Sequence, residues 1–174
     1  MVKFISFILI LSMISCKNVY KNKYGIYEPN KSNYLLKDKK GDDIPIELDT
    51  LNLYKYYGYY GENNDLIKEK SLNGWDIYNK YCSNGRFFSF GTDKLTEKNL
   101  DPNYGTKGYY IYNSKEREIK SEVYTNGNGG QFVILRFKIS KLGDTLTSFD
   151  KNIKQSVYIR VKIPQEWKRF KSNW

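Results

Sequence analysis

Apolar and polar side chains alternate at every second position over several segments of the second half of the chain. In residues 157–163 the apolar members are Val157, Ile159, Val161 and Ile163. In residues 132–139 they are Val133, Leu135, Phe137 and Ile139. Because successive side chains of a strand point to opposite faces, this period predicts strands with one buried face and one wet face.

The same pattern and the turn residues between segments predict the other strands. They are expected at residues 108–112, 119–124, 75–82 and 86–90, and, on weaker patterns, at 34–37, 44–48 and 145–149. Asn84-Gly85 joins two of these runs, and both residues accept the positive φ of a type I′ hairpin turn. Turn clusters lie at residues 63–65, 126–130 and 141–144. Residues 92–103 are expected to form a polar connection that could contain one helical turn, ended by Asp101-Pro102.

No long amphipathic helix is visible, and many short strands are separated by brief turns. This arrangement predicts an all-β, antiparallel, up-and-down meander. A meander of this kind removes its exposed edges most easily by curling. We therefore expect a small barrel or a strongly curved sheet, with a two-sheet β-sandwich as the alternative.

The amino terminus has the parts of a secretory signal. Lys3 precedes an apolar run over residues 4–14, and the small Ser15 follows it. The run is shorter than the roughly 20 apolar residues that a membrane-spanning helix needs. We therefore predict export rather than a transmembrane segment.

The end of this run, Leu11-Ser12-Met13-Ile14-Ser15-Cys16, resembles a bacterial lipobox. The resemblance implies cleavage before Cys16, a diacylglyceryl (lipid) thioether on its sulfur and an acylated new amino terminus. An ordinary secretory signal with an incidental cysteine is the alternative. The expected division is a signal peptide over residues 1–15, a lipidated tether over 16–23 and one β domain over 24–174. Lys17 and the lack of acidic residues up to Lys23 indicate, by the same resemblance, an outer-membrane anchor facing the periplasm.

A wider resemblance covers roughly residues 85–167. The segments KGYYIYN, EIKSEVYT, GGQFVILRFKIS, GDTL and VYIRVKIPQEW are similar to those of small Bacteroidetes lipoproteins with lipocalin-like meanders. The resemblance implies a lipocalin-like barrel that could hold a small apolar ligand.

The net charge of +10 does not by itself indicate a nucleic-acid partner. The chain has no alanine and is rich in Lys, Asn, Tyr and Ile, whose codons are AT-rich, so a biased genome accounts for much of the lysine. Arginine recognises phosphate through its planar fork, and here it is scattered, at positions 86, 117, 136, 160 and 169. We expect no nucleic-acid partner.

The chain contains no histidine, which excludes Ser-His-Asp and Cys-His catalysis and histidine zinc sites. The carboxylate pairs Glu47–Asp49 and Asp42–Asp43 are read as solvated surface. Gly127–Gly130 lacks the Lys-Ser/Thr of a phosphate loop and is read as a hairpin turn. We therefore expect no catalytic residue, metal or cofactor. Cys82 would have no disulfide partner once Cys16 is acylated, and we expect it buried in a strand or core.

Two aromatic groups are candidate binding residues. The first would line the barrel interior around a small apolar ligand, or fill it solid: Phe88, Phe90, Tyr109, Ile111, Leu135 and Phe137. The second could contact a partner protein or form an inward aromatic strand face that breaks at Gly58 and Gly61: Tyr54, Tyr56, Tyr57, Tyr59 and Tyr60.

The carboxyl-terminal segment after Pro164 would, if helical, place Trp167, Phe170 and Trp174 on one face, to plug a barrel mouth or to lie in a lipid interface. The expected function is a lipid-anchored, non-catalytic envelope protein that binds a small apolar ligand. A protein-interaction module using residues 54–60 is the alternative, and a carboxylate-only hydrolase is the third possibility.

Overall fold

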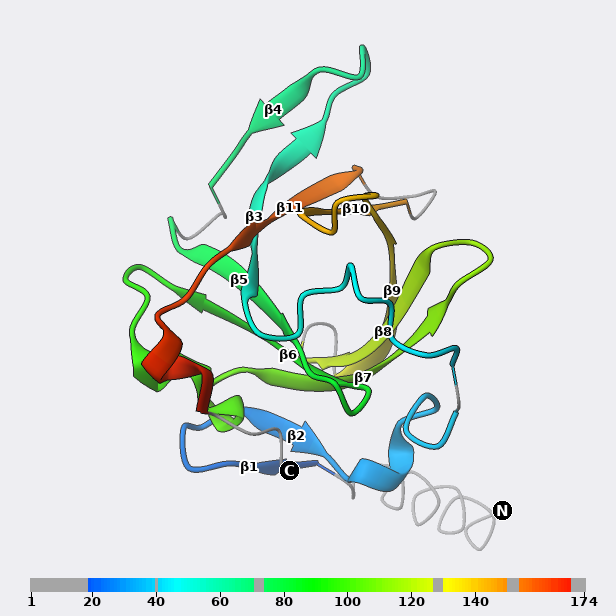
Figure 1. Cartoon of the computed structure of the whole chain (residues 1–174). Coiled ribbons are helices and arrows are strands. Elements are labelled where there is room, and N and C mark those ends of the chain that lie inside the picture. The colour runs from blue at the N-terminus through cyan, green and yellow to red at the C-terminus, as the bar shows by residue number, and fades with distance from the viewer. Residues whose placement is uncertain (1–18, 40, 71–73, 127–129, 150–153, 170–174) are drawn as a thin grey trace, which may run out of the picture.

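Each strand of the main sheet pairs antiparallel with its neighbours, mostly in chain order. The computed structural model describes residues 19–39, 41–70, 74–126, 130–149 and 154–169 (Figure 1). Its strands are β1 (Val19–Lys21), β2 (Tyr27–Pro29), β3 (Leu53–Tyr60), β4 (Leu66–Lys68), β5 (Asp76–Tyr81), β6 (Arg86–Thr92), β7 (Thr106–Asn113), β8 (Glu118–Thr125), β9 (Gln131–Ile139), β10 (Thr145–Ser148) and β11 (Ser156–Val161). The short 3-10 turns are η1 (Lys31–Asn33), η2 (Glu97–Leu100), η3 (Pro102–Tyr104) and η5 (Gln165–Arg169).

The main sheet closes on itself. Its order is β11-β10-β9-β8-β7-β6-β5-β3-β4, and β11 also pairs with β3, so eight strands form a closed barrel and β4 lies outside the ring (Figure 1). The predicted all-β, up-and-down barrel is therefore confirmed, and the sandwich alternative is not found. Closure leaves no free edge within the ring itself.

The extra strand β4 forms a hairpin with the second half of β3. Tyr54 and Lys55 pair with β5, whereas residues 58–60 pair with β4. Gly58 stands where the partner changes, and a Cβ there would collide with the backbone carbonyl of Ile67. β3 stays paired with β11 up to Tyr59, and the hairpin projects from the upper end of the molecule in Figure 1.

One half of the barrel interior is filled by large side chains. They come from the inward face of the barrel strands and from one loop: Leu48, Tyr54, Tyr81, Phe87, Tyr110, Tyr112, Ile119, Val123, Phe137, Ile139 and Leu146. Because these positions alternate with outward ones along each strand, the predicted period-two pattern places them together. Aromatic rings dominate this core and pack edge to face or stacked.

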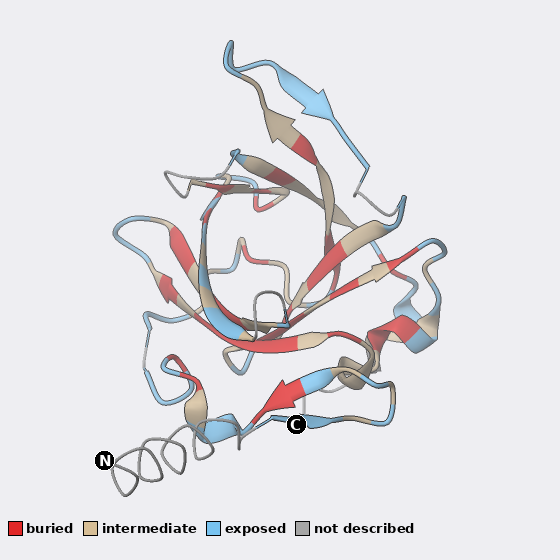
Figure 2. Cartoon of the chain, turned by 180° about the vertical axis from the view of Figure 1, so that it is seen from behind, coloured by how far each residue is buried: buried red, intermediate tan, exposed pale blue. Residues whose placement is uncertain are grey.

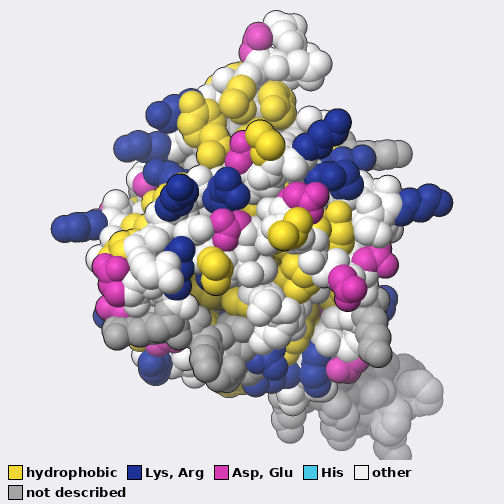
Figure 3. Space-filling model, viewed as in Figure 1, with side chains coloured by type: hydrophobic (Ala, Val, Ile, Leu, Met, Phe, Trp, Pro, Cys, Tyr) yellow, Lys and Arg dark blue, Asp and Glu magenta, His cyan; other side chains and the backbone are white. Residues whose placement is uncertain are grey.

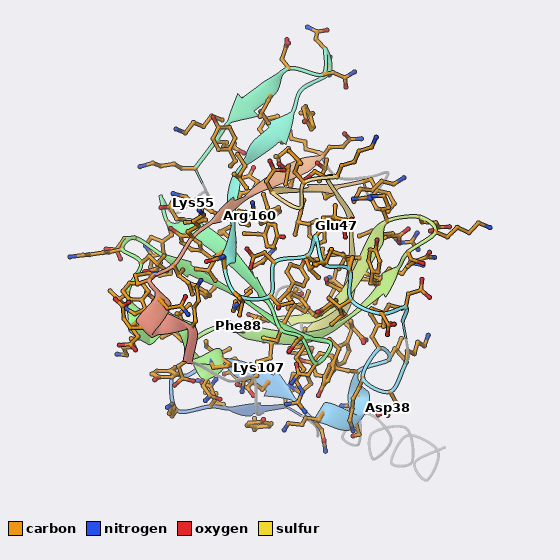
Figure 4. All side chains as sticks on the ribbon, viewed as in Figure 1. Asp38, Glu47, Lys55, Phe88, Lys107 and Arg160 are labelled. Carbon is orange, nitrogen blue, oxygen red and sulfur yellow. The ribbon has the colours of Figure 1, made fainter. Side chains whose placement is uncertain are left out.

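The loop over residues 41–50 crosses the mouth of the filled half (Figure 1). Leu48 of this loop joins the core. The Tyr54 hydroxyl donates to the carbonyl of Gly143 at 2.8 Å and accepts from the Asp49 amide at 3.0 Å. Gly143 has φ +68° and has no room for a Cβ against the carbonyl of Glu47. Figure 4 labels Glu47 on this crossing loop. Residues 44–48, expected to form a strand, instead close the barrel mouth.

Several strands are buried on both faces, because segments outside the ring cover their outer side. Residues 107–110 of β7 are all buried, so both faces of the strand are covered there, and Figure 2 shows burial along this strand. A second cluster outside the ring joins Leu53, Tyr78, Phe88, Phe90, Leu100 and Ile163. A third joins Tyr34, Leu36 and Tyr109. Residues 34–37 were expected as a strand, but here they are an irregular segment that packs on the barrel.

The small sheet β1–β2 lies against the outside of the barrel at its lower end in Figure 1. Lys107 of β7 donates to Glu28 at 2.9 Å and to the side chain of Asn103 at 2.7 Å, and both charged side chains are less than a tenth exposed. Asn22 and Tyr20 also donate to the Glu28 carboxylate. Residues 19–21, expected to belong to a tether, are thus part of the folded domain.

The hairpin between β5 and β6 is present, but its turn differs from the expected type. Gly85 has φ +76°, whereas Asn64 and Arg117 are the only non-glycine residues with positive φ in the part of the chain that the structure describes. The amide of Gly85 donates to the carbonyl of Cys82 at 3.3 Å. A left-handed glycine after a turn with ordinary φ values is the three-residue hairpin, not type I′.

Candidate functional site

The other half of the barrel interior is hollow. An open cavity of about 990 Å³ lies at the barrel end opposite the crossing loop and extends along the outside of the rim. Its lining is largely aromatic and aliphatic, with hydroxyl, amide and charged groups among these: Tyr24, Gly25, Ile26, Tyr56, Glu69, Lys70, Trp75, Ile77, Ser89, Phe90, Gly91, Tyr104, Gly105, Thr106, Asn126, Ser156 and Tyr158.

A gradient of side-chain size along the strands explains why one half is full and the other hollow. The inward positions of β6 are Phe87 in the filled core, then Ser89 and Gly91 at the cavity. The inward side of β7 likewise changes from Tyr110 in the core to Thr106 at the cavity. At one end of the barrel, large inward side chains fill the interior. At the other end, small side chains on neighbouring strands leave a space.

Two tyrosines lie between the filled core and the cavity. The rings of Tyr56 and Tyr158 meet edge to face with their centroids 5.5 Å apart, and Tyr158 also packs on Phe137. The Tyr56 hydroxyl donates to the Glu69 carboxylate at 3.0 Å. Burial, and then this hydrogen bond, raise the pKa of Tyr56 to about 12. Both phenols are therefore neutral at ordinary pH, and each offers an apolar ring with a polar tip.

The rest of the wall comes from segments outside the ring. Tyr24, in the turn between β1 and β2, meets Tyr104 with ring centroids 5.5 Å apart, and its hydroxyl donates to Asp101 at 3.0 Å. Trp75, directly before β5, is 51% exposed and lies over Gly91 of β6, where a Cβ would stand 3.2 Å from the indole. The cavity thus presents aromatic surfaces on several sides.

The six residues expected to line one interior are divided among three places. Phe137 belongs to the filled core and Leu135 packs against it. Phe88 and Phe90 belong to the second cluster, outside the ring, although Phe90 also reaches the cavity rim. Tyr109 and Ile111 pack in the third cluster. These four residues of β6 and β7 therefore point outward and do not line the interior. They are aromatic or aliphatic because segments outside the ring cover the outer side of both strands.

The tyrosine-rich segment also divides. Tyr54 is fully buried in the core, and Tyr56 lines the cavity. Tyr57, Tyr59 and Tyr60 are half-buried on the projecting hairpin, where Lys68 stands 5.5 Å from the ring centre of Tyr57 and Lys154 stands 3.9 Å from that of Tyr59. The first two tyrosines therefore point inward, and the last three lie on the hairpin surface.

The expected surface carboxylates are occupied by local contacts. Asp49 accepts from the amides of Leu51 and Asn52 and lies 3.7 Å from Arg160. Burial alone would raise its pKa, but the hydrogen bonds from Asn52 and Leu51, with the Arg160 charge, hold that pKa below its usual value. Asp42 accepts from the amide and the hydroxyl of Ser114. Asp42 also lines an open surface hollow that Glu118 and Lys120 share.

Two other carboxylates, on β8, are buried. Glu122 accepts from the Leu36 amide at 2.7 Å, and Glu118 lies near Lys120 and Arg136. They lie four positions apart along the strand, which places their backbones about 13 Å apart, beyond the roughly 5–9.5 Å that paired glycosidase carboxylates use. Among the described residues no three His, Cys, Asp or Glu side chains form a group that could hold a metal ion.

Up to Arg169, the carboxyl-terminal segment packs on the outside of the barrel and not in its mouth. Trp167 of η5 packs against the second cluster, and together with Lys80 and Cys82 it lines a small crevice there. Cys82 is half-buried directly after β5. Phe170 and Trp174 lie outside the described residues, as do Cys16 and the whole signal segment. Among the helices of the described ranges, none has the length and apolarity to cross a membrane.

The sequence reasoning missed most of the cavity lining. Trp75, Tyr158 and Ser89 were each read as strand residues without a role. The sequence does contain one signal for the cavity, the decrease in side-chain size from Phe87 through Ser89 to Gly91. Relating this decrease to the neighbouring strands requires the strand register, which the sequence does not give. Compared with protein-family models, with curated proteins and with solved structures, the chain gives no match in any of the three.

Proposed function

We propose that this chain is a lipid-anchored protein of the bacterial cell envelope that binds a small, largely apolar ligand in the hollow half of its barrel and performs no catalysis. The open cavity of about 990 Å³ carries this proposal, because its volume and mostly apolar lining are those of a ligand site. Lipidation at Cys16 and an outer-membrane location facing the periplasm rest on the lipobox resemblance alone.

The polar groups in the lining narrow the ligand chemistry. Ser89, Thr106 and Ser156 present hydroxyls, and Glu69 and Lys70 stand at the hairpin side of the rim. A few polar groups in an apolar cavity fix the orientation of a ligand rather than supply most of its affinity. The ligand that fits is an apolar or aromatic body with one hydrogen-bonding group.

A filled-cavity variant tests the site. Ser89→Phe places a ring in the hollow half, so the affinity for the neutral apolar dye Nile red should fall at least about tenfold, measured by fluorescence titration. Ser83→Phe, in the exposed β5–β6 turn, is the matched control and should leave the affinity unchanged. Equal affinities for the wild type and Ser89→Phe would place the dye elsewhere and contradict the proposal. Labelled palmitate on the wild type and its loss in Cys16→Ser test the anchor separately.

The projecting hairpin favours a second function, contact with another envelope protein. Leu66 and Ile67 of β4 are 43% and 42% exposed, and the outer edge of β4 pairs with no described strand. Figure 3 shows hydrophobic side chains gathered over this end of the molecule. An unpaired strand edge with apolar side chains is a site at which an extended partner segment can add a strand.

Charged side chains on β4 should abolish such a contact without affecting the barrel. Leu66→Lys with Ile67→Glu should remove any partner crosslinked to the hairpin in intact cells, while the thermal midpoint stays within about 2 °C of the wild type, since exposed substitutions change stability little. Lys141→Glu with Leu142→Lys, in the exposed β9–β10 turn, is the control pair. An unchanged crosslinked product would exclude the hairpin as the contact.

A further inference from the structure

The proposed anchor determines which side of the domain would face the membrane. Cys16 precedes Val19, the first residue of β1, by three residues, and such a segment spans at most about 10 Å. Since β1–β2 is held to the barrel by the buried Lys107–Glu28 pair, this small sheet cannot move far from the anchor. In Figures 1 and 2, β1, β2 and η1 lie at one end of the molecule and the β3–β4 hairpin lies at the opposite end.

The segment next to the anchor carries much of the positive charge of the chain. Residues 17–40 contain seven lysines but only two acidic residues, Glu28 and Asp38. Glu28 is buried against Lys107, which leaves Asp38 as the exposed carboxylate of this segment. The described lysines of this segment are all exposed, although Lys23 is paired with Asp101: Lys21, Lys23, Lys31, Lys37 and Lys39.

Exposed apolar side chains accompany these lysines. Val19 and Tyr27 are 43% and 44% exposed on β1–β2, and Leu35 is 69% exposed. In the antiparallel register Lys21 lies opposite Tyr27, and its amino group stands 4.7 Å from the ring centre. Lysines next to an aromatic ring and aliphatic side chains suit the interface of a bilayer, where the charge meets headgroups and the ring sits at their level. Figure 4 labels Lys107 and Asp38 at this end of the molecule.

We propose that this basic face, made of the five lysines with Val19, Tyr27 and Leu35, lies on the anionic surface of the membrane that holds the anchor. The proposal rests on lipidation at Cys16 in the proposed function and adds an orientation to it. The β3–β4 hairpin then points away from the membrane. The occupant is a bilayer with anionic headgroups, because basic side chains near a membrane surface each gain from its negative potential within a Debye length of about 8 Å.

Site-resolved acetylation tests the orientation. Protein purified from its membrane is placed in vesicles of phosphatidylcholine with or without phosphatidylglycerol and trace-labelled with a membrane-impermeant amine acetylating reagent. Acetylation of Lys21, Lys31, Lys37 and Lys39 should slow at least about threefold on the anionic vesicles and recover in about 1 M salt. Lys68, Lys70 and Lys154 at the hairpin and Lys141 in the β9–β10 turn, all exposed and outside the basic face, should react equally on both. Equal rates at the first set, or protection of the second set, would overturn the proposal.

Two variants that each lose four positive charges distinguish binding by the basic face from general electrostatic attraction of the protein to the vesicles. Lys23 belongs to the same face, so its acetylation should also slow on anionic vesicles, and it serves as the reporter. Replacing Lys21, Lys31, Lys37 and Lys39 by Gln should remove this protection, whereas the same change at Lys68, Lys70, Lys141 and Lys154 should keep it. Protection of Lys23 in both variants would also refute the basic face. The mass of the Cys16 peptide is read in the same samples. An unacylated Cys16 with the four lysines still protected would overturn the anchor and keep the face.

Discussion

Lys107→Met is expected to lower the free energy of unfolding by about 3–5 kcal/mol, because it leaves the Glu28 carboxylate buried without its counter-charge. Glu28 is 6% exposed and lies between the β1–β2 sheet and the barrel wall. Urea unfolding followed by fluorescence measures the change. Amide hydrogen exchange should also accelerate in β1 and β2, since this pair holds them to β7.

Two further variants identify the cause of that loss. Lys141→Met removes a lysine from the exposed β9–β10 turn and should change the stability by less than about 0.5 kcal/mol. Lys107→Met combined with Glu28→Gln should regain at least half of the loss, because no charge then stays buried and the amide oxygen can still accept the hydrogen bond that Asn22 donates to Oε1. A double variant as unstable as the single one would mean that packing of the lysine chain, not the buried charge, is what matters.

Period-two alternation was sufficient to predict the barrel because it is a local property of each strand. The patterns in residues 132–139 and 157–163 gave β9 and β11 nearly in full. Closure between β3 and β11 could not be read from either strand alone, since the two pair over a separation of about a hundred residues. Curling was expected from the cost of free edges, and the pairing of β11 with β3 is how this chain avoids them.

The inward and outward faces were harder to predict than the strands. On β6 the aromatic residues Phe87, Phe88 and Phe90 occupy both parities, so composition does not show which one faces the barrel. The outer aromatic pair is buried because η2, η3 and η5 cover it, and none of these short turns has a strong sequence signal. The assumption of one wet face per strand failed here, and with it the expected lining of the cavity.

Two segments that precede β3, the first strand of the barrel, were assigned wrongly for a related reason. Residues 19–21 read as a polar tether, yet they pair with β2 because buried contacts to Lys107 and Asn103 hold that sheet in place. Residues 44–48 read as a weak strand, but the Tyr54 hydroxyl binds the neighbouring Asp49 amide and fixes the segment across the barrel mouth. Both outcomes depend on partners more than a few residues away, which propensity does not register.

The buried tyrosines predict a cooperative loss of the fold at alkaline pH. Burial raises the pKa of Tyr54 to about 12 from 10.0, and burial also raises the pKa of Tyr81 and of Tyr110. A phenol whose pKa is higher in the folded state holds its proton there while the unfolded chain has already lost it. This stability is complete below pH 10 and disappears as the pH rises towards 12. For Tyr54 alone the two pH units correspond to about 2.7 kcal/mol.

A spectrophotometric titration of the phenolates, read together with near-ultraviolet circular dichroism, should therefore show two steps. Solvent-exposed phenols ionise first and gradually near pH 10. The buried ones ionise later, in a steep step that coincides with loss of the dichroism, because they can lose their protons only when the barrel opens. Tyr27→Phe, at a position that is 44% exposed, is the control and should leave the second step unmoved. A single gradual step near pH 10 with the dichroism intact would mean that the tyrosine core is open to water. That result would contradict the closely packed half of the barrel interior.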